Sequence, residues 1–347
     1  MFDWVKEPYQ DEDMSRRMPA EWEAVEAVQI ILPNANTDWE YILDEVKQCY
    51  ADLRRALEKT GVKVVVVGKR EDAGELLKNE TLIDLPYNDT WARDCSPITV
   101  FDQHGIRHLI DFQFNGWGLK FAADKDNLLG RGVYENIFKG EGYEYEAHYE
   151  TVLEGGSIES DGKGTIMTSV HCLTSPNRNG HTVDEMEDIL GKTLGAKRVL
   201  WLKHGALSGD DTDGHIDTLA RLAPNDTIIY VGAPKDKADP DYQGLVDMKA
   251  DLESFRTWDE EPFKLVELPF PTRVYDDEGE MLPGTYANYL YVNNYILLPI
   301  YGVEEDAEAI KVMQQVFPDK EILAVNCRAL IKQHGSLHCV TMQYPKA

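Results

Sequence analysis

The residue best suited to covalent chemistry lies close to the C-terminal end of the chain. Cys339 follows a small-residue turn in the segment Gly335-Ser336-Leu337-His338-Cys339 and precedes an alternating run to Gln343. This pattern predicts a thiol at the mouth of a terminal strand. A thiolate attacks electrophilic carbon well, but it needs a histidine or a positive field to lower its pKa. The alternative is a buried structural cysteine, so the interpretation depends on the residues that accompany Cys339.

Three further segments have the density of polar residues that is typical of site loops between strands. They are residues 86–94 (PYNDTWARD), 153–158 (LEGGSI) and 209–217 (GDDTDGHID). The paired glycines of the second segment allow a close approach of the backbone to a ligand or to another segment. In the third segment, four carboxylates surround the single histidine, His215. These segments are where we expect the partners of Cys339.

His215 and Asp217 form the most informative pair. On a strand, residues two apart point to the same face, so His215 and Asp217 are expected to project into one site. Acyl transfer by a cysteine and a histidine requires oxyanion donors rather than further carboxylates. Carboxylates around a thiol instead favour an electrophile that is itself a cation. A guanidinium fits, because it is planar, has five N–H donors and pairs bidentately with carboxylates.

Other interpretations of the same residues stay open at this point. Asp211, Asp213, His215 and Asp217 could bind a divalent metal, although a site for a hard cation would explain neither the cysteine nor the paired glycines. The same run could be a solvated acidic loop. Trp91 alone could serve packing rather than ligand stacking. Glu154 alone could simply end a strand.

The composition narrows the range of partners. The chain has 347 residues, with 62 acidic and 35 basic side chains and a formal net charge of -27. Such a surface repels phosphate backbones and attracts cations, so we expect no nucleic-acid partner and favour a small cationic substrate. Solubility alone would also explain the charge. The cysteines are scattered, which indicates neither a disulfide framework nor a thiolate zinc cluster; they are Cys49, Cys95, Cys172, Cys327 and Cys339.

The sequence lacks the signals of export and membrane insertion. Its first residues have no positively charged start followed by an apolar core, and no segment approaches the ~18 uninterrupted apolar residues of a membrane span. We therefore expect a cytoplasmic protein without a membrane partner. Residues 1–17 are polar and are expected to form a loose arm. The sequence leaves a homo-oligomer open.

The chain alternates strand-like and helical patterns. An apolar strand at 27–33, a helix capped by Thr37 and ended by Gly61, and a β-branched strand at 62–67 form the first unit. Further helices are expected at 183–194, 242–258 and 307–317. Further strands are expected at 98–100, 108–114, 164–168, 198–202, 217–222, 227–231, 263–268, 286–292, 295–299, 322–326 and 338–343. No Pro/Ser-rich linker divides the chain, which predicts a single α/β domain over residues 1–347.

Two arrangements of these elements are compatible with the pattern. Alternation by itself favours a doubly wound sheet, but no GxGxxG or Walker-type loop follows a strand. Strands also clearly outnumber helices, as in repeated ββαβ modules around an axis, and modules of about 70 residues would fit roughly five times. Because the sequence shows no self-similarity, the pattern alone does not decide between the two.

The segments together resemble the agmatine deiminase family, the bacterial branch of the peptidylarginine-deiminase-like enzymes that modify guanidines. The resemblance extends from residue 18 to residue 345 and rests on eight ordered motifs: MPAEWE, NDTWARD, FNGWG, EGGSI, PNRN, DTDGHID, YANYLYVNN and HGSLHC. It implies the five-bladed α/β propeller called the pentein fold, with the site on its axis. The chain departs from many agmatine deiminases at Ile31-Leu32-Pro33 and at residues 158–162.

The resemblance also implies roles for individual residues. Cys339 matches the nucleophile and His215 the general acid and base. Asp94 and Asp217 match the carboxylates that grip the guanidinium, and Glu154 matches the acid that orients the histidine. Trp91 matches an aromatic side chain beside the aliphatic part of the substrate. The implied mechanism passes through a covalent S-alkylthiouronium and requires no metal or organic cofactor.

The substrate expected from these features is agmatine. Free arginine would bring an α-carboxylate into an acidic site, whereas the amine of agmatine could pair with Asp211 or Asp213. Peptidyl-arginine is the alternative substrate and would suit a secreted enzyme. A protein that binds polyamines without turning them over, using Trp91 and the carboxylates, is a further alternative. Such a binder would have no need of Cys339.

Overall fold

The first strand of the chain pairs with the last. In the computed structural model, which describes residues 16–73 and 80–347, β1 (Val25–Ile31) lies between β18 (Met342–Pro345), which is antiparallel to it, and β2 (Lys63–Val67), which is parallel. The helix α1 (Leu43–Thr60) connects β1 to β2 and buries the apolar face predicted from its spacing. Gly61 ends α1 with a φ of 71°, the left-handed conformation that glycine adopts without a steric penalty.

The same arrangement recurs along the part of the chain that the structure describes. Four further sheets each contain an antiparallel pair of strands followed by a parallel strand that a helical connection delivers. They are β4 (Ile98–Phe101), β5 (Arg107–Gln113) and β6 (Tyr143–Val152); β7 (Ile158–Ser160), β8 (Thr165–Ser169) and β9 (Arg198–Leu202); β10 (Ala220–Ala223), β11 (Thr227–Val231) and β12 (Lys264–Leu268); and β15 (Leu290–Val292), β16 (Tyr295–Ile300) and β17 (Glu321–Asn326). The mixed α/β class is therefore confirmed, and the order of strands in each sheet is that of a ββαβ module.

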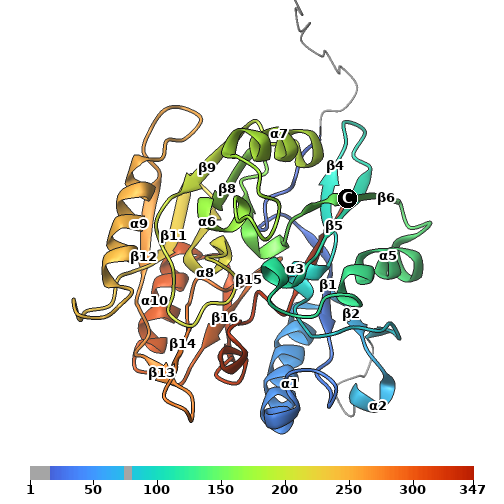
Figure 1. Ribbon diagram of the computed structural model, residues 1–347, viewed down its shortest axis with the longest axis horizontal. Helices are drawn as coiled ribbons and strands as arrows, with labels where there is room; N and C mark the ends of the chain where they lie inside the picture. The colour runs from blue at the N-terminus through green and yellow to red at the C-terminus, as the bar shows by residue number, and fades with distance from the viewer. Residues whose placement is uncertain (1–15, 74–79) are drawn as a thin grey trace, which may run out of the picture.

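The longer helices lie toward the periphery, and the short helices that carry polar residues lie near the middle of the view in Figure 1. The connecting helices α7 (Val183–Leu194), α9 (Tyr242–Ser254) and α10 (Asp306–Val316) were all predicted, with small differences at their ends. Thr182 and Glu185 form a capping box that fixes the start of α7. The remaining short elements are β3 (Thr81–Ile83), β13 (Val274–Tyr275), β14 (Met281–Leu282), α2 (Arg70–Ala73), α3 (Ala92–Cys95), α4 (Gly116–Leu119), α5 (Leu129–Val133), α6 (Val170–Leu173) and α8 (Ile216–Leu219).

Several local predictions were wrong. Thr37 does not cap α1, because its hydroxyl instead donates to Asn34 O at 2.7 Å and a 3-10 turn precedes the helix. Residues 217–222 form a helical turn and then β10 rather than one strand, and residues 338–341 form a turn before β18. Of residues 286–292, only Leu290–Val292 is a strand. Side-chain hydrogen bonds to the backbone stabilise these turns, some local, as from Thr37 to Asn34 O, and some distant, as from the His338 N–H to Asn288; periodicity does not report such bonds.

Most of the predicted N-terminal arm, residues 1–15, lies outside the described residues. The last two residues of that arm are held in place, contrary to the prediction. Arg16 forms an ion pair with Glu146 at 2.9 Å, and Arg17 forms a β-bridge with Phe101. The chain is therefore anchored to the sheet of β4, β5 and β6 before β1 begins.

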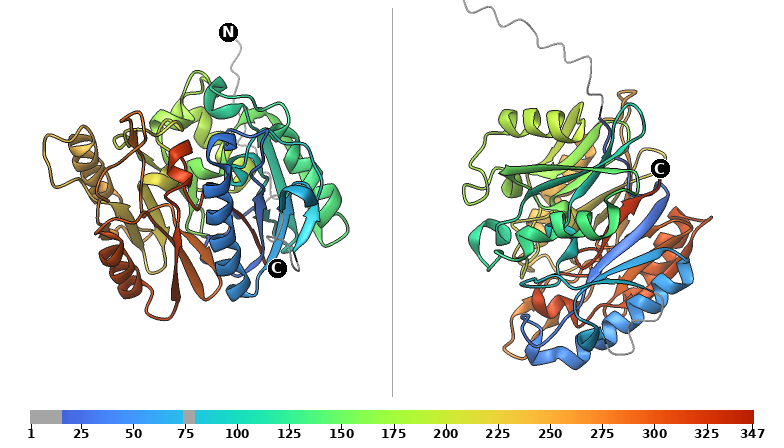
Figure 2. Two further views of the ribbon diagram at one scale, coloured as in Figure 1. Left: turned by 90° about the horizontal axis from the view of Figure 1, so that it is seen from below. Right: turned by 90° about the vertical axis from the view of Figure 1, so that its right-hand side faces the viewer.

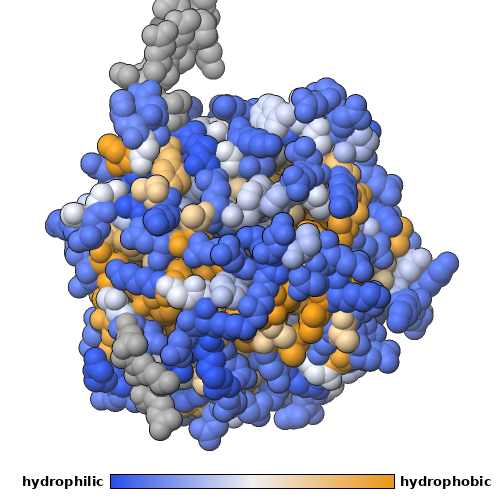
Figure 3. Space-filling model, turned by 180° about the vertical axis from the view of Figure 1, so that it is seen from behind, coloured by the Kyte–Doolittle hydropathy of each residue, from blue (hydrophilic) through white to orange (hydrophobic). Residues whose placement is uncertain are grey.

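Buried apolar side chains join the modules to one another. Both views of Figure 2 place α1 beside β17, and the two elements are in contact. One large cluster of buried apolar residues extends from β1 to β18, and a smaller cluster surrounds α9 and β11. The face in Figure 3 is mostly hydrophilic, with smaller hydrophobic patches between the polar residues. None of the helices within residues 16–73 and 80–347 has the length and apolar character needed to cross a bilayer.

Candidate active site

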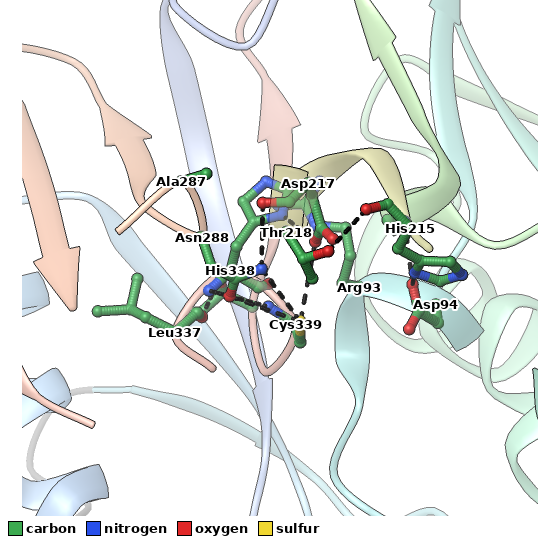
Figure 4. A network of polar contacts seen from close by, with 12 residues as sticks. Arg93, Asp94, His215, Asp217, Thr218, Ala287, Asn288, Leu337, His338 and Cys339 are labelled. Atoms are coloured by element: carbon green, nitrogen blue, oxygen red, sulfur yellow. Dashed lines mark hydrogen bonds and ion pairs between the residues drawn. The ribbon is translucent and has the colours of Figure 1, made fainter. Parts of the chain in front are cut away.

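Parts of three predicted site segments line one cavity, whereas residues 153–158, His215 and Asp217 are buried and do not line it. It has a volume of about 280 Å³, and Cys339, Asp94 and Trp91 line it together with Trp117 and Gly335. Figure 4 shows Cys339, Asp217 and Asn288 close together, with His215 and Asp94 beside them. These residues come from the C-terminal turn, α8, the segment before β15, and α3. Segments that are more than a hundred residues apart in the sequence therefore supply one site.

Cys339 sits in the turn that precedes β18, so the prediction of a thiol at the mouth of the terminal strand is confirmed. Asn288, which the sequence interpretation missed, holds this turn. Its Oδ1 accepts the backbone N–H of His338 at 2.8 Å, and its Nδ2 lies 3.3 Å from Cys339 Sγ. Burial, and then the charges of Asp217 and Asp94, raise the pKa of the Cys339 thiol well above its ordinary value. The raised pKa favours the neutral thiol.

His215 and Asp217 do project into one site, but not from a strand. His215 is the N-cap of α8 and Asp217 lies in its first turn. Asp213 and Gly214 turn the chain with φ values of 64° and 81°, and the carboxylate of Asp210 accepts the N–H of Gly214 at 2.8 Å. The hydroxyl of Thr212 accepts the N–H of His215 at 3.0 Å. One acidic residue of the segment thus stabilises the turn rather than binding a ligand.

Asp94 is the second buried carboxylate at the cavity. Its Oδ1 accepts the N–H of Gly156 at 2.9 Å, and its Oδ2 accepts Nε1 of Trp117 at 3.0 Å. A Cβ on Gly156 would lie 2.7 Å from His215 Nδ1 and 2.8 Å from Asp94 Oδ1, so only glycine lets this backbone approach so closely. Trp117 adopts a left-handed backbone conformation with a φ of 54°, the kind of local strain that often occurs at functional sites.

Three buried polar atoms at the site have no hydrogen-bond partner among the described residues. They are Nδ1 and Nε2 of His215 and Oδ1 of Asp217. The closest charged neighbour of His215 is Asp94, with 3.7 Å between Nδ1 and Oδ1. Burial alone would lower the pKa of His215, but the Asp94 carboxylate and its other neighbours raise that pKa to about 10. Because buried polar groups in proteins are normally paired, these atoms indicate a place for a polar ligand.

Glu154 is fully buried, as the role of orienting His215 would require, but its hydrogen bonds go elsewhere. Both of its oxygens accept a hydrogen bond from Nε of Arg178, at 2.8 and 3.1 Å. Glu154, Cys172 and His215 have ligand atoms within 4.8 Å of one another. This group could coordinate a metal only if Glu154 released Arg178. Arg178 lies in the PNRN motif, and the sequence interpretation assigned it no role.

The two loop carboxylates that were predicted to bind the substrate amine have different surroundings. Asp213 is engaged by Arg178 and by Lys120, each at 2.6 Å, and does not line the cavity. Asp211 lines the cavity, is partly exposed, and lies 3.7 Å from His334 Nε2. The alternative metal site is not assembled, because Asp217 faces the buried thiol while Asp213 pairs with two basic side chains.

Trp91 lines the cavity and lies directly against Gly335, where no side chain would fit. Its Nε1 donates to Asp89 Oδ2 at 3.0 Å, and its ring contacts the rings of Trp39 and Trp117. The tryptophan therefore presents a fixed aromatic face to whatever enters. Burial, together with the charge of Asp38, raises the pKa of Asp89 to about 7.

The model of the family described as Porphyromonas-type peptidyl-arginine deiminase matches residues 17–345. The chain belongs to this family. A candidate agmatine deiminase of Photobacterium profundum is 33% identical, with 95% of this chain and 96% of that protein covered. The family resemblance that the motifs indicated is therefore confirmed over nearly the whole chain.

Solved structures agree with the family match. The structure of a candidate arginine deiminase from Porphyromonas gingivalis is 45% identical with a TM-score of 0.89, and covers 95% of this chain and 98% of that one. A cysteine-to-serine variant of C. jejuni agmatine deiminase with substrate bound is 33% identical with a TM-score of 0.89, and covers 96% and 97%. The deiminase family thus includes relatives that are named for two different guanidine substrates.

Proposed function

We propose that this protein is a deiminase that hydrolyses agmatine to N-carbamoylputrescine and ammonia. The observation that carries the proposal is the set of unpartnered buried atoms on His215 and Asp217, which lie beside a neutral thiol and a second buried carboxylate, Asp94. A guanidinium supplies planar N–H donors for both carboxylates and places an electrophilic carbon over Cys339. A neutral ligand would add no positive charge beside the Asp94 carboxylate, whose own hydrogen-bond donors are neutral.

The positive charge of the substrate also activates the nucleophile. A guanidinium between Asp94 and Asp217 offsets the two negative charges that hold the thiol in its protonated form. Cys339 then loses its proton to a base or water in the site, and its sulfur forms a bond to the guanidinium carbon. The same carboxylates accept hydrogen bonds from the nitrogens of the neutral tetrahedral adduct and stabilise the positive charge that returns when the leaving nitrogen is protonated, so the interactions persist through the step that needs them.

His215 is suited to the proton transfers that follow. Its raised pKa of about 10 keeps the imidazole protonated at neutral pH, so it can protonate the departing nitrogen as ammonia. The carbon–nitrogen bond breaks and leaves an S-alkylthiouronium on Cys339. His215, now neutral, accepts a proton from water, which attacks the same carbon and releases the ureido product and the thiol. Glu154, held by Arg178, would stabilise the charged imidazole through space.

The remainder of the cavity favours agmatine over arginine. Asp38 and Asp211 line it together with Lys125, and the two carboxylates attract an ammonium but oppose the α-carboxylate of arginine. Trp91 offers an aromatic face to the butyl chain of the substrate. Asp211 is retained as a partner of the distal amine, whereas Asp213 is committed to Lys120 and Arg178. The substrate-bound C. jejuni agmatine deiminase supports this choice by similarity.

We further propose that the five ββαβ sheets are the blades of one pentein propeller with the site on its axis, in a single catalytic domain over residues 1–347. The pairing of β1 with β18 supports a closed ring, because it joins the two ends of the chain in one sheet. We propose a cytoplasmic enzyme that needs no metal or organic cofactor. Treatment with a chelator should leave turnover unchanged, and loss of activity that zinc or another metal restores would contradict this.

The experiment that tests the function is ammonia release from agmatine, free arginine and an arginine-containing peptide at equal concentrations. We expect turnover of agmatine with a kcat/KM at least about tenfold above that of either other substrate, and none in the Cys339→Ser variant. Preferential turnover of the peptide would replace agmatine by peptidyl-arginine as the substrate. Binding of agmatine without any ammonia release would establish the polyamine-binding alternative.

A further inference from the structure

The residue before the proposed nucleophile lies between two carboxylates. His338 is fully buried, and its Nδ1 lies 2.7 Å from Asp217 Oδ2. Its Nε2 lies 2.8 Å and 3.0 Å from the two oxygens of Glu21. Figure 4 shows the imidazole beside Asp217 and Cys339. Neither His338 nor Glu21 has a part in the mechanism proposed above, although both lie in motifs, HGSLHC and MPAEWE, that the sequence singles out.

The direction of the bond to Asp217 does not depend on the charge of His338. A carboxylate only accepts hydrogen bonds, so Nδ1 of His338 must carry the hydrogen. The other nitrogen faces both Glu21 and Nη2 of Arg221, which is 3.1 Å away. Nε2 can therefore donate to the carboxylate or accept from the guanidinium. In either state, Asp217 Oδ2 accepts a hydrogen bond from His338 Nδ1.

A buried charge network fixes His338 in this position. Arg221 is fully buried and donates to Glu21, to Glu159 and to the backbone oxygen of Tyr289 at 2.6 Å. It thereby connects the N-terminal segment, β7 and β10 to the segment that carries Asn288. Rotation of the imidazole would remove the Nδ1 hydrogen bond from the fully buried Asp217. Glu21 would keep its contacts with Arg93, Arg221 and Gln343.

We propose that His338 is a positioning residue. Its hydrogen bond holds one oxygen of the ionised Asp217 carboxylate, so that the other oxygen, the unpartnered Oδ1, faces the guanidinium. Glu21 holds His338 in turn. The proposal rests on the deiminase function proposed above. It assigns to the MPAEWE segment, which lies far from Cys339 in the sequence, a part in positioning the Asp217 carboxylate.

We call Asp94, which lines the cavity, and Asp217, which is buried beside Cys339, the floor carboxylates. They differ in the way that this proposal requires. Among the described residues, the hydrogen-bond donors to Asp94 are neutral, Gly156 N–H and Trp117 Nε1. Burial raises its pKa, and the opposing effect of His215 does not cancel that rise. Burial also opposes ionisation of Asp217, but His338 and then His215 and Arg221 lower its pKa below the ordinary value. The groups that face this pair are Asp94, His215, Cys339, Arg221 and Glu21.

Two amide substitutions test the two hydrogen bonds of His338 separately. The amide nitrogen of asparagine can occupy the place of Nδ1, so His338→Asn keeps a donor toward Asp217. The longer glutamine reaches the place of Nε2, so His338→Gln keeps the contact with Glu21 and loses the bond to Asp217. Because asparagine is one methylene shorter than glutamine, His338→Asn removes more buried volume, and circular dichroism with thermal unfolding shows whether each variant is folded.

The first measurement is the pKa of Asp217 by carbon-13 NMR of labelled aspartate carboxyls, assigned with Asp217→Asn. We expect His338→Gln to raise that pKa by about one unit or more, the equivalent of a lost hydrogen bond to a charged group. In His338→Asn the pKa should stay close to that of the wild type. The same value in all three proteins would overturn the proposal, whether or not the protein turns over agmatine.

The second measurement is the pH dependence of kcat/KM for agmatine. Because a higher pKa leaves Asp217 protonated at higher pH, the acid limb should move upward in His338→Gln by the same shift that the NMR experiment measures, about one pKa unit or more. His338→Asn should keep the acid limb of the wild type, whatever its overall rate. Equal losses in both variants with unshifted acid limbs would show a purely structural role. Absence of turnover in the wild type would instead contradict the proposed function and leave the NMR result to stand by itself.

Discussion

The floor carboxylates, Asp94 and Asp217, and the acidic residues of the loop at the side of the cavity are the same kind of residue in opposite roles. On the floor, Asp94 and Asp217 are fully buried beside a thiol, and one oxygen of Asp217 is unpartnered. In the loop, Asp210 accepts backbone N–H groups and Asp213 pairs with Lys120 and Arg178. An acidic run in the sequence therefore divides into carboxylates that the protein satisfies by itself and carboxylates that it leaves for a ligand.

The largest effect that would sharpen this comparison is expected from Cys339→Ser. A hydroxyl is a much weaker nucleophile at neutral pH but has a similar volume, so turnover of agmatine should be abolished while binding is largely retained. Ammonia release measures the first, and calorimetric titration with agmatine measures the second. If the variant kept even about a tenth of wild-type activity, the thiol would not be the nucleophile.

The next effect concerns the floor carboxylates. Asp94→Asn and Asp217→Asn each remove one charged partner of a guanidinium in a site closed to water. Such a loss is worth roughly 2 to 5 kcal/mol, or about 30-fold to several thousand-fold in kcat/KM for agmatine. Steady-state kinetics on variants shown to be folded checks this. Values within a few-fold of wild type in both variants would mean that these carboxylates do not grip the substrate.

The same two substitutions should have the opposite effect on the free thiol. Because Asp217 and Asp94 raise the pKa of Cys339, removing either charge lowers that pKa and increases the thiolate fraction. Alkylation of Cys339 by iodoacetamide at pH 8 should accelerate by several-fold to about tenfold in each variant, as a shift of up to one pKa unit predicts. Asp211→Asn is the matched control and should react at the wild-type rate. Unchanged or slower alkylation in Asp217→Asn would contradict the account of the floor.

The smallest effects are expected in the loop, and they should differ in kind. Asp211→Asn removes a partly exposed carboxylate and should raise KM for agmatine by a few-fold at most, with kcat unchanged. Asp213→Asn weakens the ion pairs with Arg178 and Lys120, so it should lower the thermal unfolding temperature by a few degrees. A loss in Asp211→Asn as large as that in Asp217→Asn would remove the distinction between loop and floor.

The sequence was sufficient to group the residues that we propose to react, but it did not show which residues surround them. The α/β class and the helices α7, α9 and α10 follow from periodicity, and Cys339 stands out through its chemistry. That His215 and Asp217 face one site was predicted, but from a strand; the left-handed turn at Asp213 and Gly214 makes the segment a helix start instead. A period of two residues therefore gave the correct grouping for an incorrect reason.

The residues that were missed are those that act through distant contacts. Asn288, Trp117, Arg178 and His338 contact the site residues across 23 to 121 positions of sequence. The pattern of a single sequence does not reveal such contacts. Each lies in a motif that was recognised as a unit, so the available signal was a hydrogen-bonding side chain within an otherwise apolar or glycine-rich segment. Asn288 between apolar residues of YANYL is the clearest case.

The central claim is that the two floor carboxylates hold a guanidinium with its carbon facing position 339. The most direct test is the crystal structure of Cys339→Ser soaked with agmatine. We predict that the guanidinium nitrogens lie within hydrogen-bond distance of the Asp94 and Asp217 carboxylates, including Asp217 Oδ1, with the butyl chain along Trp91 and the amine toward Asp211. Agmatine bound with its amine between Asp94 and Asp217, or bound outside this cavity, would contradict the account.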